Sequence, residues 1–226
     1  MKQGRSIRRF TAIALATALA LGPGAAAQGA VFFSEYLEGS ASNKALEIYN
    51  SSAKAVDLAG FEVRVYANGS ATATGTVSLT GRTVPAGGTL VMAHPSSVPA
   101  LLALAQMTSG SLNFNGDDAV ALFAGGVPLD HIGQVGFDPG DAWGSAALGT
   151  RDQTLRRLSA VTEGDVNIGG LFDPAGGWSS FPVDTFSGLG QHASAPPSVP
   201  LPPSLALLAS AVGGLGLLRR RPHLLA

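Results

Sequence analysis

Phe61-Glu62-Val63-Arg64-Val65-Tyr66 is the stretch that most clearly indicates the fold of this chain. The apolar residues Phe61, Val63 and Val65 alternate with more polar neighbours, so they recur at every second position. This period is typical of a half-buried β-strand, because successive side chains of a strand point to opposite faces of the sheet. The stretch predicts a strand whose three alternating apolar side chains belong to the core.

Further segments with strand character are separated by turn residues. The expected strands are Lys44–Asn50, Thr89–Ala93, Ala119–Phe123 and Val127–Val135, with Leu46 and Ile48 as core positions. Turn signals lie between them, at Asn50-Ser51-Ser52, Asn68-Gly69, Pro85-Ala86-Gly87-Gly88, Asn115-Gly116-Asp117 and Gly125-Gly126. Many short strands in a chain with 30 glycines predict an all-β, antiparallel sandwich.

One short helix is expected within this sandwich. Ser97–Gln106 has helical character, with Ser97 as a candidate N-cap and Pro99 near the first helical position. We expect this helix to cross from one sheet to the other.

The N-terminal 27 residues have the pattern of a signal peptide. Lys2, Arg5, Arg8 and Arg9 precede the apolar segment Phe10–Leu21, and the small residues Ala25, Ala26 and Ala27 follow. We expect signal peptidase to cleave after Ala27. Arg8-Arg9 suggests a twin-arginine signal, but Phe10 follows directly and the rest of that pattern is missing, so Sec export is favoured.

The C-terminal residues form a second targeting segment. A Pro/Ser linker and motif at 194–203 contains Val199, Pro200, Leu201 and Pro202, and precedes the apolar segment Ser204–Leu218. Those fifteen residues would form a helix of roughly 22 Å, shorter than the hydrocarbon core of about 30 Å. The basic residues Arg219, Arg220 and Arg221 follow, within the tail 219–226, and would hold that end in the cytoplasm.

This C-terminal arrangement resembles a PEP-CTERM sorting tail of the VPLPA type, which belongs to Gram-negative bacteria. The resemblance implies cleavage near the motif by an exosortase-type enzyme and delivery to the cell surface or the medium. Leu201 stands where the better-known motif has Glu. The alternative is a helix that is never cut and anchors the protein permanently in the inner membrane.

The charge and the cysteine content restrict the functions and the kind of core that the expected exported part can have. The whole chain has a formal charge of −1, but the part between the two targeting segments has seven basic and all fifteen acidic residues. Such an excess of carboxylates repels phosphate backbones, so direct nucleic-acid binding is not expected. With no cysteine, the core has no disulfides to stabilise it. About 170 residues suffice for one such core, which we place at 28–193.

Several blocks in this region resemble, in order, the bacterial lamin tail domain of the subgroup attached to secreted nucleases. The blocks are Phe32–Ser40, Asn43–Asn50, Asn113–Leu122, Asp130–Gly136, Asp138–Gly140, Trp143–Ser145, Thr154–Arg157, Phe172–Pro174 with Trp178, and Phe186–Gly190. The resemblance spans about residues 30–193. It implies an immunoglobulin-like β-sandwich that is a non-catalytic accessory, with a generally unknown ligand.

A separate catalytic domain follows this module in the nuclease relatives, whereas here Gly190-Gln191-His192 leads into the linker. We therefore expect no enzyme. The favoured function is an exported module that binds or supports envelope or matrix, with a polysaccharide or a protein as its partner. The alternative is an accessory subunit that works in trans with a secreted nuclease or phosphatase.

One loop has the composition of a metal site. Asn113, Asn115, Asp117 and Asp118 place oxygen ligands around a glycine turn, as Ca²⁺ requires. The loop lacks the length and the bidentate Glu of an EF-hand. The same residue types also favour tight turns by bonding their own backbone. Both interpretations stay open, and no other cofactor is expected.

The remaining candidates each have a structural interpretation beside the functional one. His131 is expected to be a structural histidine, because no second histidine stands at metal-ligand spacing. Of Arg156 and Arg157, we expect one to point outward and the other to pair with a carboxylate, although the pair could bind an anion. Trp143 and Trp178 could stack on sugar rings or pack over the end of the sandwich. Glu35, Glu38 and Glu47 could form an acidic cluster, although Glu47 more simply bonds backbone amides at a sandwich edge.

Overall fold

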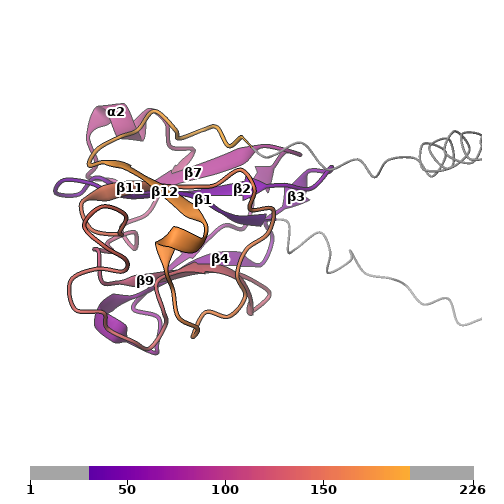
Figure 1. The fold of residues 1–226 in the computed structure, drawn as a ribbon. Coiled ribbons are helices and arrows are strands. Elements are labelled where there is room, and N and C mark those ends of the chain that lie inside the picture. The colour runs from indigo at the N-terminus through magenta and orange to yellow at the C-terminus, as the bar shows by residue number, and fades with distance from the viewer. Residues whose placement is uncertain (1–30, 194–226) are drawn as a thin grey trace, which may run out of the picture. The chain divides into compact units, whose positions relative to one another are not determined.

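Two β-sheets stack face to face in the computed structural model, which describes residues 31–193 (Figure 1). The large sheet has the strand order β12 (Trp178–Pro182), β11 (Gln153–Arg157), β1 (Val31–Glu38), β2 (Lys44–Asn50), β7 (Thr89–Ala93) and β8 (Met107–Thr108). The smaller sheet has the order β10 (Val127–Ile132), β9 (Ala119–Ala124), β4 (Phe61–Tyr66) and β5 (Gly75–Ser78). A two-stranded ribbon of β3 (Val56–Asp57) and β6 (Thr83–Val84) accompanies them, together with the short 3-10 helices η1 (Ala67–Gly69) and η2 (Pro174–Gly176). This architecture agrees with the expected immunoglobulin-like sandwich.

The expected strands are present, and the single difference of note has a local cause. β2, β4 and β7 have the predicted bounds, and β9 extends one residue further, to Ala124. β10 ends at Ile132 rather than Val135. Gly133 follows it with φ of +80°, a conformation that does not continue a strand.

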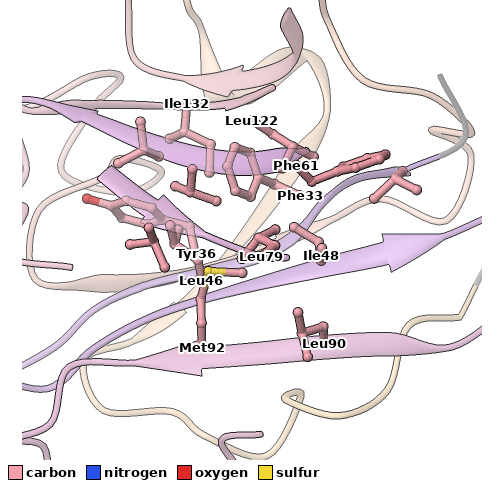
Figure 2. Close-up of a cluster of buried hydrophobic side chains, with 14 of the residues drawn as sticks. Phe33, Tyr36, Leu46, Ile48, Phe61, Leu79, Leu90, Met92, Leu122 and Ile132 are labelled. Carbon is pink, nitrogen blue, oxygen red and sulfur yellow. The ribbon is translucent and has the colours of Figure 1, made fainter. Parts of the chain in front are cut away.

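The core lies between the two sheets, where the predicted alternation places it. Phe61, Val63 and Val65 are at most 4% exposed, and Leu46 and Ile48 are fully buried. Figure 2 shows a part of this buried cluster in the shared interior. The labelled side chains are Phe33, Tyr36, Leu46, Ile48, Phe61, Leu79, Leu90, Met92, Leu122 and Ile132.

The predicted helix is shorter than expected and has a different role. Helix α2 spans Pro99–Leu102, and its N-cap is Val98 rather than Ser97. The Val98 amide donates instead to Asn43 Oδ1 (2.9 Å) in the β1–β2 hairpin. The chain cannot stay helical to Gln106, because the Gln106 amide donates to the Val91 carbonyl in β7 (3.0 Å). Moreover, α2 connects β7 to its parallel neighbour β8 in the same sheet, so it does not cross between sheets.

The outer face of the large sheet is also covered. β1 and β2 are buried along their whole length, on both faces. Residues 184–192, here called the strap, run across this face on the side of α2 (Figure 1). Phe186 and Leu189 of the strap pack with Leu101 of α2 and with Leu37 and Val91 of the sheet. The strap thus closes a second, smaller core.

Candidate functional site

A buried carboxylate organises one end of the sandwich. Asp130 in β10 is fully buried, and its Oδ2 accepts a hydrogen bond from the Phe33 amide (2.8 Å) and pairs with the Arg157 guanidinium. Its Oδ1 accepts from the Asp165 amide (2.9 Å). One side chain thereby connects both sheets and the following loop. It was not singled out as a site residue from the sequence, although an Asp between Leu129 and His131 in an apolar strand was an available signal.

Both arginines of the Arg156-Arg157 pair are occupied, so the prediction that one points outward is wrong. Arg157 also donates from Nε to the Phe33 carbonyl (3.1 Å), and its guanidinium lies 4.2 Å from the centre of the Trp178 ring. Arg156 donates from Nε to Glu35 Oε2 (3.1 Å) and lies over the Phe181 ring at 4.0 Å. The two carboxylates come from β1 of the same sheet and from β10 of the opposite sheet, so neither arginine is free to bind an anion.

A recess of about 430 Å³ opens beside the Asp130–Arg157 pair. Its lining includes His131, Glu163, Asp165, Leu171, Phe172 and Asp173. Leu171 is 86% exposed, which is unusual for a large apolar side chain. An apolar contact beside three carboxylates suits a ligand that offers both an apolar and a polar or cationic group.

His131 serves the fold, in agreement with the structural interpretation. It is 2% exposed, and its Nδ1 lies 2.6 Å from the Gly133 carbonyl oxygen. Its Nε2 lies 3.6 Å from Asp165 Oδ2, and its ring packs against Phe172 with centroids 5.8 Å apart. The two hydrogen-bonding positions of the ring therefore face groups of the domain itself.

The two tryptophans are buried within the domain and are not available to a ligand at the surface. Trp143 and Trp178 are 4% and 3% exposed. Trp178 belongs to the main core, whereas the Trp143 ring lies 5.9 Å from the Phe137 ring. Neither indole has the open face that stacking on a sugar requires.

The structure uses the Asn113–Asp118 loop as a turn. Asp118 accepts hydrogen bonds from the Asn68 amide (2.8 Å) and the Asn115 amide (3.0 Å), and burial raises its pKa. The side chains of Asn113 and Asn115 are exposed. Asp117 is 9% exposed, and its Oδ1 has no hydrogen-bond partner within residues 31–193. Among those residues, no group of three or more His, Cys, Asp or Glu side chains is arranged to hold a metal ion.

A second recess, of about 350 Å³, adjoins this loop. Glu38, Asp117, Asp141, Arg151 and Asp152 line it. Glu38 is already bound, because it pairs with Lys44 and accepts a hydrogen bond from the Asp152 amide. Arg151 lies 3.4 Å from Asp141 and 3.5 Å from Asp152. Arg151 therefore already offsets part of the negative charge of this recess.

Of the three glutamates of the predicted acidic cluster, the structure brings Glu35 and Glu47 together as a buried pair, whereas Glu38 pairs with Lys44. They are register partners on β1 and β2, and they are 1% and 0% exposed. Burial raises the pKa of Glu35 to about 8, although Arg156 opposes the change, and burial raises the pKa of Glu47 to about 7. Glu47 does accept a backbone amide bond, from Gly190 (2.5 Å), but β2 lies inside the sheet and not at its edge.

The residues predicted to direct export and sorting lie outside the described range. These are Ala25 and Ala27 at the signal cleavage position, Val199 to Pro202 in the motif, and Arg219 to Arg221 behind it. Residues 31–193 contain no helix with the length and hydropathy needed to span a membrane.

Comparison with known proteins supports the fold assignment. The family model of the lamin tail domain matches residues 24–136, which is half of the chain. No curated protein and no solved structure gives a significant match. The matched region includes β1 to β10, and hence Glu35, Glu47 and Asp130. Since the family is an immunoglobulin-like module without catalytic activity of its own, the match and the two-sheet sandwich lead to one conclusion: the chain belongs to the lamin tail domain family.

Proposed function

We propose that this protein is an exported, non-catalytic module that binds a component of the cell envelope or the extracellular matrix. The observation that carries the proposal is that several side chains of catalytic type form hydrogen bonds within the domain itself. Asp130, Arg157, His131 and Asp118 each bond backbone or side-chain groups of the domain. A general base must reach the proton of a substrate, and groups committed in this way do not.

The recess beside Leu171 is the surface that best suits a partner. An exposed leucine next to Phe172, with Glu163 and Asp173 nearby, offers an apolar contact inside an acidic rim. Binding sites commonly combine apolar contact area with a few polar groups that fix orientation. The partner is a polysaccharide or a protein of the envelope.

Capture of envelope components by the full chain tests this function. The wild-type protein should retain a specific component, and Leu171→Asp should lose it. Val127→Asp is the matched control, because Val127 is also exposed (58%) but does not line the recess. Equal retention by both variants would remove the recess from the proposal, and the absence of any specific component would contradict the binding function.

Export by Sec and C-terminal sorting belong to the same proposal. They are supported by the charged, apolar and small-residue segments of residues 1–27 and by the motif, apolar segment and arginines of residues 198–221. Mass spectrometry of the surface form should find an N-terminus at Gln28 and no Arg219–Arg221. Replacing Pro200 and Pro202 should block maturation, because both fix the backbone in an extended shape. An intact Leu218–Ala226 on the surface protein would show a permanent anchor instead.

A second candidate function rests on the sequence blocks that resemble nuclease-associated lamin tail domains. In that case the protein is an accessory subunit of a separate secreted nuclease or phosphatase. Adding the purified chain to such an enzyme from the same cells should change its rate or its substrate range. An unchanged rate at every ratio of the two proteins would eliminate this alternative.

A further inference from the structure

The strap is held to the large sheet by a small number of contacts. At its start, Asp184 accepts hydrogen bonds from the Ser40 amide (3.0 Å) and from Asn43 Nδ2 (2.9 Å) in the β1–β2 hairpin. Near its end, the Gly190 amide donates to Glu47 Oε2 (2.5 Å). Its amides at Leu189 and Gln191 bond carbonyls of the strap itself. Between these ends, the Arg156 guanidinium donates to the Ser187 hydroxyl (3.2 Å), and the His192 ring packs against Tyr49 with centroids 4.5 Å apart. The strap is therefore fastened by a few side-chain contacts and by its apolar side chains, rather than by a strand ladder.

Directly beneath the strap lie the two buried glutamates. Glu35 and Glu47 stand opposite each other on adjacent strands, and Glu35 Oε1 has no hydrogen-bond partner among the described residues. The close approach has no room for a side chain on the strap, since a Cβ at position 188 would overlap both the Arg156 guanidinium and Glu35 Oε2. The strap backbone thus lies directly against the pair, with Gly188 over Glu35 and Gly190 at Glu47.

One cation faces two carboxylates. Arg156 of β11 lies beside Glu35, and the Ser34 hydroxyl of β1 donates to Glu47 (2.6 Å). From β7, Thr89 supplies a hydroxyl, and α2 (Pro99–Leu102) carries no charged side chain. The titratable groups of the strap are Asp184, at the hairpin, and His192, whose pKa is lowered by burial and then by Arg157. Full ionisation of both glutamates would therefore leave one negative charge uncompensated in a buried position.

The strap is the part of this cover that yields most easily. Opposed like charges on neighbouring strands are destabilising, and so is a buried charge without a partner. Hydration of the pair relieves both costs. β1 and β2 are held by ladders on both sides, to β11 and β7 as well as to each other. Lifting the strap breaks far fewer backbone bonds than separating these central strands.

We propose that the strap, residues 184–192, opens in alkaline solution when Glu35 and Glu47 both lose their protons, and closes again on acidification. The direction follows from linkage. Both pKa values are raised, to about 8 and about 7, so the closed form binds protons more tightly than an open form with hydrated carboxylates. The closed form is thus favoured at low pH and loses this advantage as the pH rises through that range. The apolar face formed by Leu37, Val91 and Leu101 is exposed on opening.

Thiol labelling in the full chain tests the proposal, because the protein has no cysteine of its own. Leu189→Cys reports on the strap, and Val183→Cys, at a position 44% exposed, reports the intrinsic labelling rate at each pH. The ratio of the two labelling rates corrects for the effect of pH on the ionisation of the thiol itself. We expect it to rise about tenfold or more between about pH 6 and about pH 9, since each displaced pKa unit is worth a factor of about ten.

Three controls decide the cause of such a rise. In the Glu35→Gln/Glu47→Gln background the ratio should be nearly independent of pH. If that variant does not fold, Glu47→Gln alone keeps the Arg156–Glu35 pair and should reduce the rise. Ala121→Cys, buried in β9 of the other sheet, should stay protected throughout. A constant ratio, an equal rise in the glutamine variants, or parallel labelling of Ala121→Cys would each overturn the proposal.

Discussion

Single buried residues carry much of the organisation of this sandwich. Asp130 bonds the Phe33 amide, the Asp165 amide and Arg157, which lie 97, 35 and 27 positions from it in the sequence. A buried carboxylate is stabilised only when its oxygens are satisfied, and here both are. Arg157, which lines the recess beside Leu171, is thereby held by the buried carboxylate.

The Asp130–Arg157 pair makes a prediction about stability. Arg157→Ala should lower the free energy of unfolding by about 3–5 kcal/mol, because it leaves the fully buried Asp130 without its cation. Arg64→Ala is the matched control: Arg64 pairs with Glu62 at the surface, and its loss should cost at most about 1 kcal/mol. Urea unfolding of both variants measures the difference. Equal costs would show that the buried pair has no special role.

The alternating core positions make a second prediction. Ile48→Ala and Phe61→Ala should each destabilise the protein by about 2–5 kcal/mol, because both side chains are buried between the sheets. Val127→Ala, at an exposed position of β10, should change the stability by less than about 0.5 kcal/mol. The same unfolding experiment measures all three. If Ile48→Ala and Phe61→Ala destabilise the protein as little as Val127→Ala does, the assignment of these strand faces to the core is wrong.

At the scale of elements, the covers of the large sheet differ in how they are fixed. The inner face packs against the four-stranded sheet through the main core. The outer face is covered by α2, which has only four residues, and by the strap. Segments with few buried contacts open more easily than the strands they cover. The outer cover is therefore the first part expected to exchange with solvent.

The strap prediction can be tested without any change of pH. Gly188→Ala should displace the strap, because the added methyl group overlaps Arg156 and Glu35. Limited proteolysis should then cut the chain faster within 184–192. Gly169→Ala is the control, since a Cβ there meets no atom within 4 Å. An unchanged cleavage rate of Gly188→Ala would mean that the side chains of Arg156 and Glu35 move aside and that the position of the strap does not depend on a glycine at 188.

At the scale of the whole molecule, charge and composition restrict the possible activities. Residues 28–193 have eight more acidic than basic side chains, which weakens the approach of polyanions. Phosphodiester cleavage usually requires metal-activated water with a base in reach. We therefore expect the full chain to match buffer in nuclease assays with Mg²⁺, Mn²⁺ or Ca²⁺.

Asp117 provides the decisive variant for that prediction, because its buried Oδ1 has no partner among residues 31–193. Asp117→Ala should alter folding or cation binding at most. Metal-dependent cleavage that co-purifies with the chain and disappears in Asp117→Ala would instead make this protein an enzyme.

The sequence by itself determined five of the twelve strands found in residues 31–193, the core face of those strands and the class of the fold. Phe61, Val63 and Val65 occupy every second position because a strand buried on one face needs an apolar residue at every second position. The blocks that resemble the lamin tail domain add the family. These features depend on near neighbours in the chain, so they can be predicted without knowing which strands pair.

Only the tertiary structure decided the buried polar pairs, the length of the helix and the strap. Glu35 faces Glu47 because of the register of β1 with β2, and Gly190 reaches Glu47 across 143 positions of the chain. The helix stops early because Gln106 pairs with Val91 in β7. Such contacts follow from strand order and register, which local periodicity does not encode. They also position the two glutamates on which the proposed opening of the strap depends.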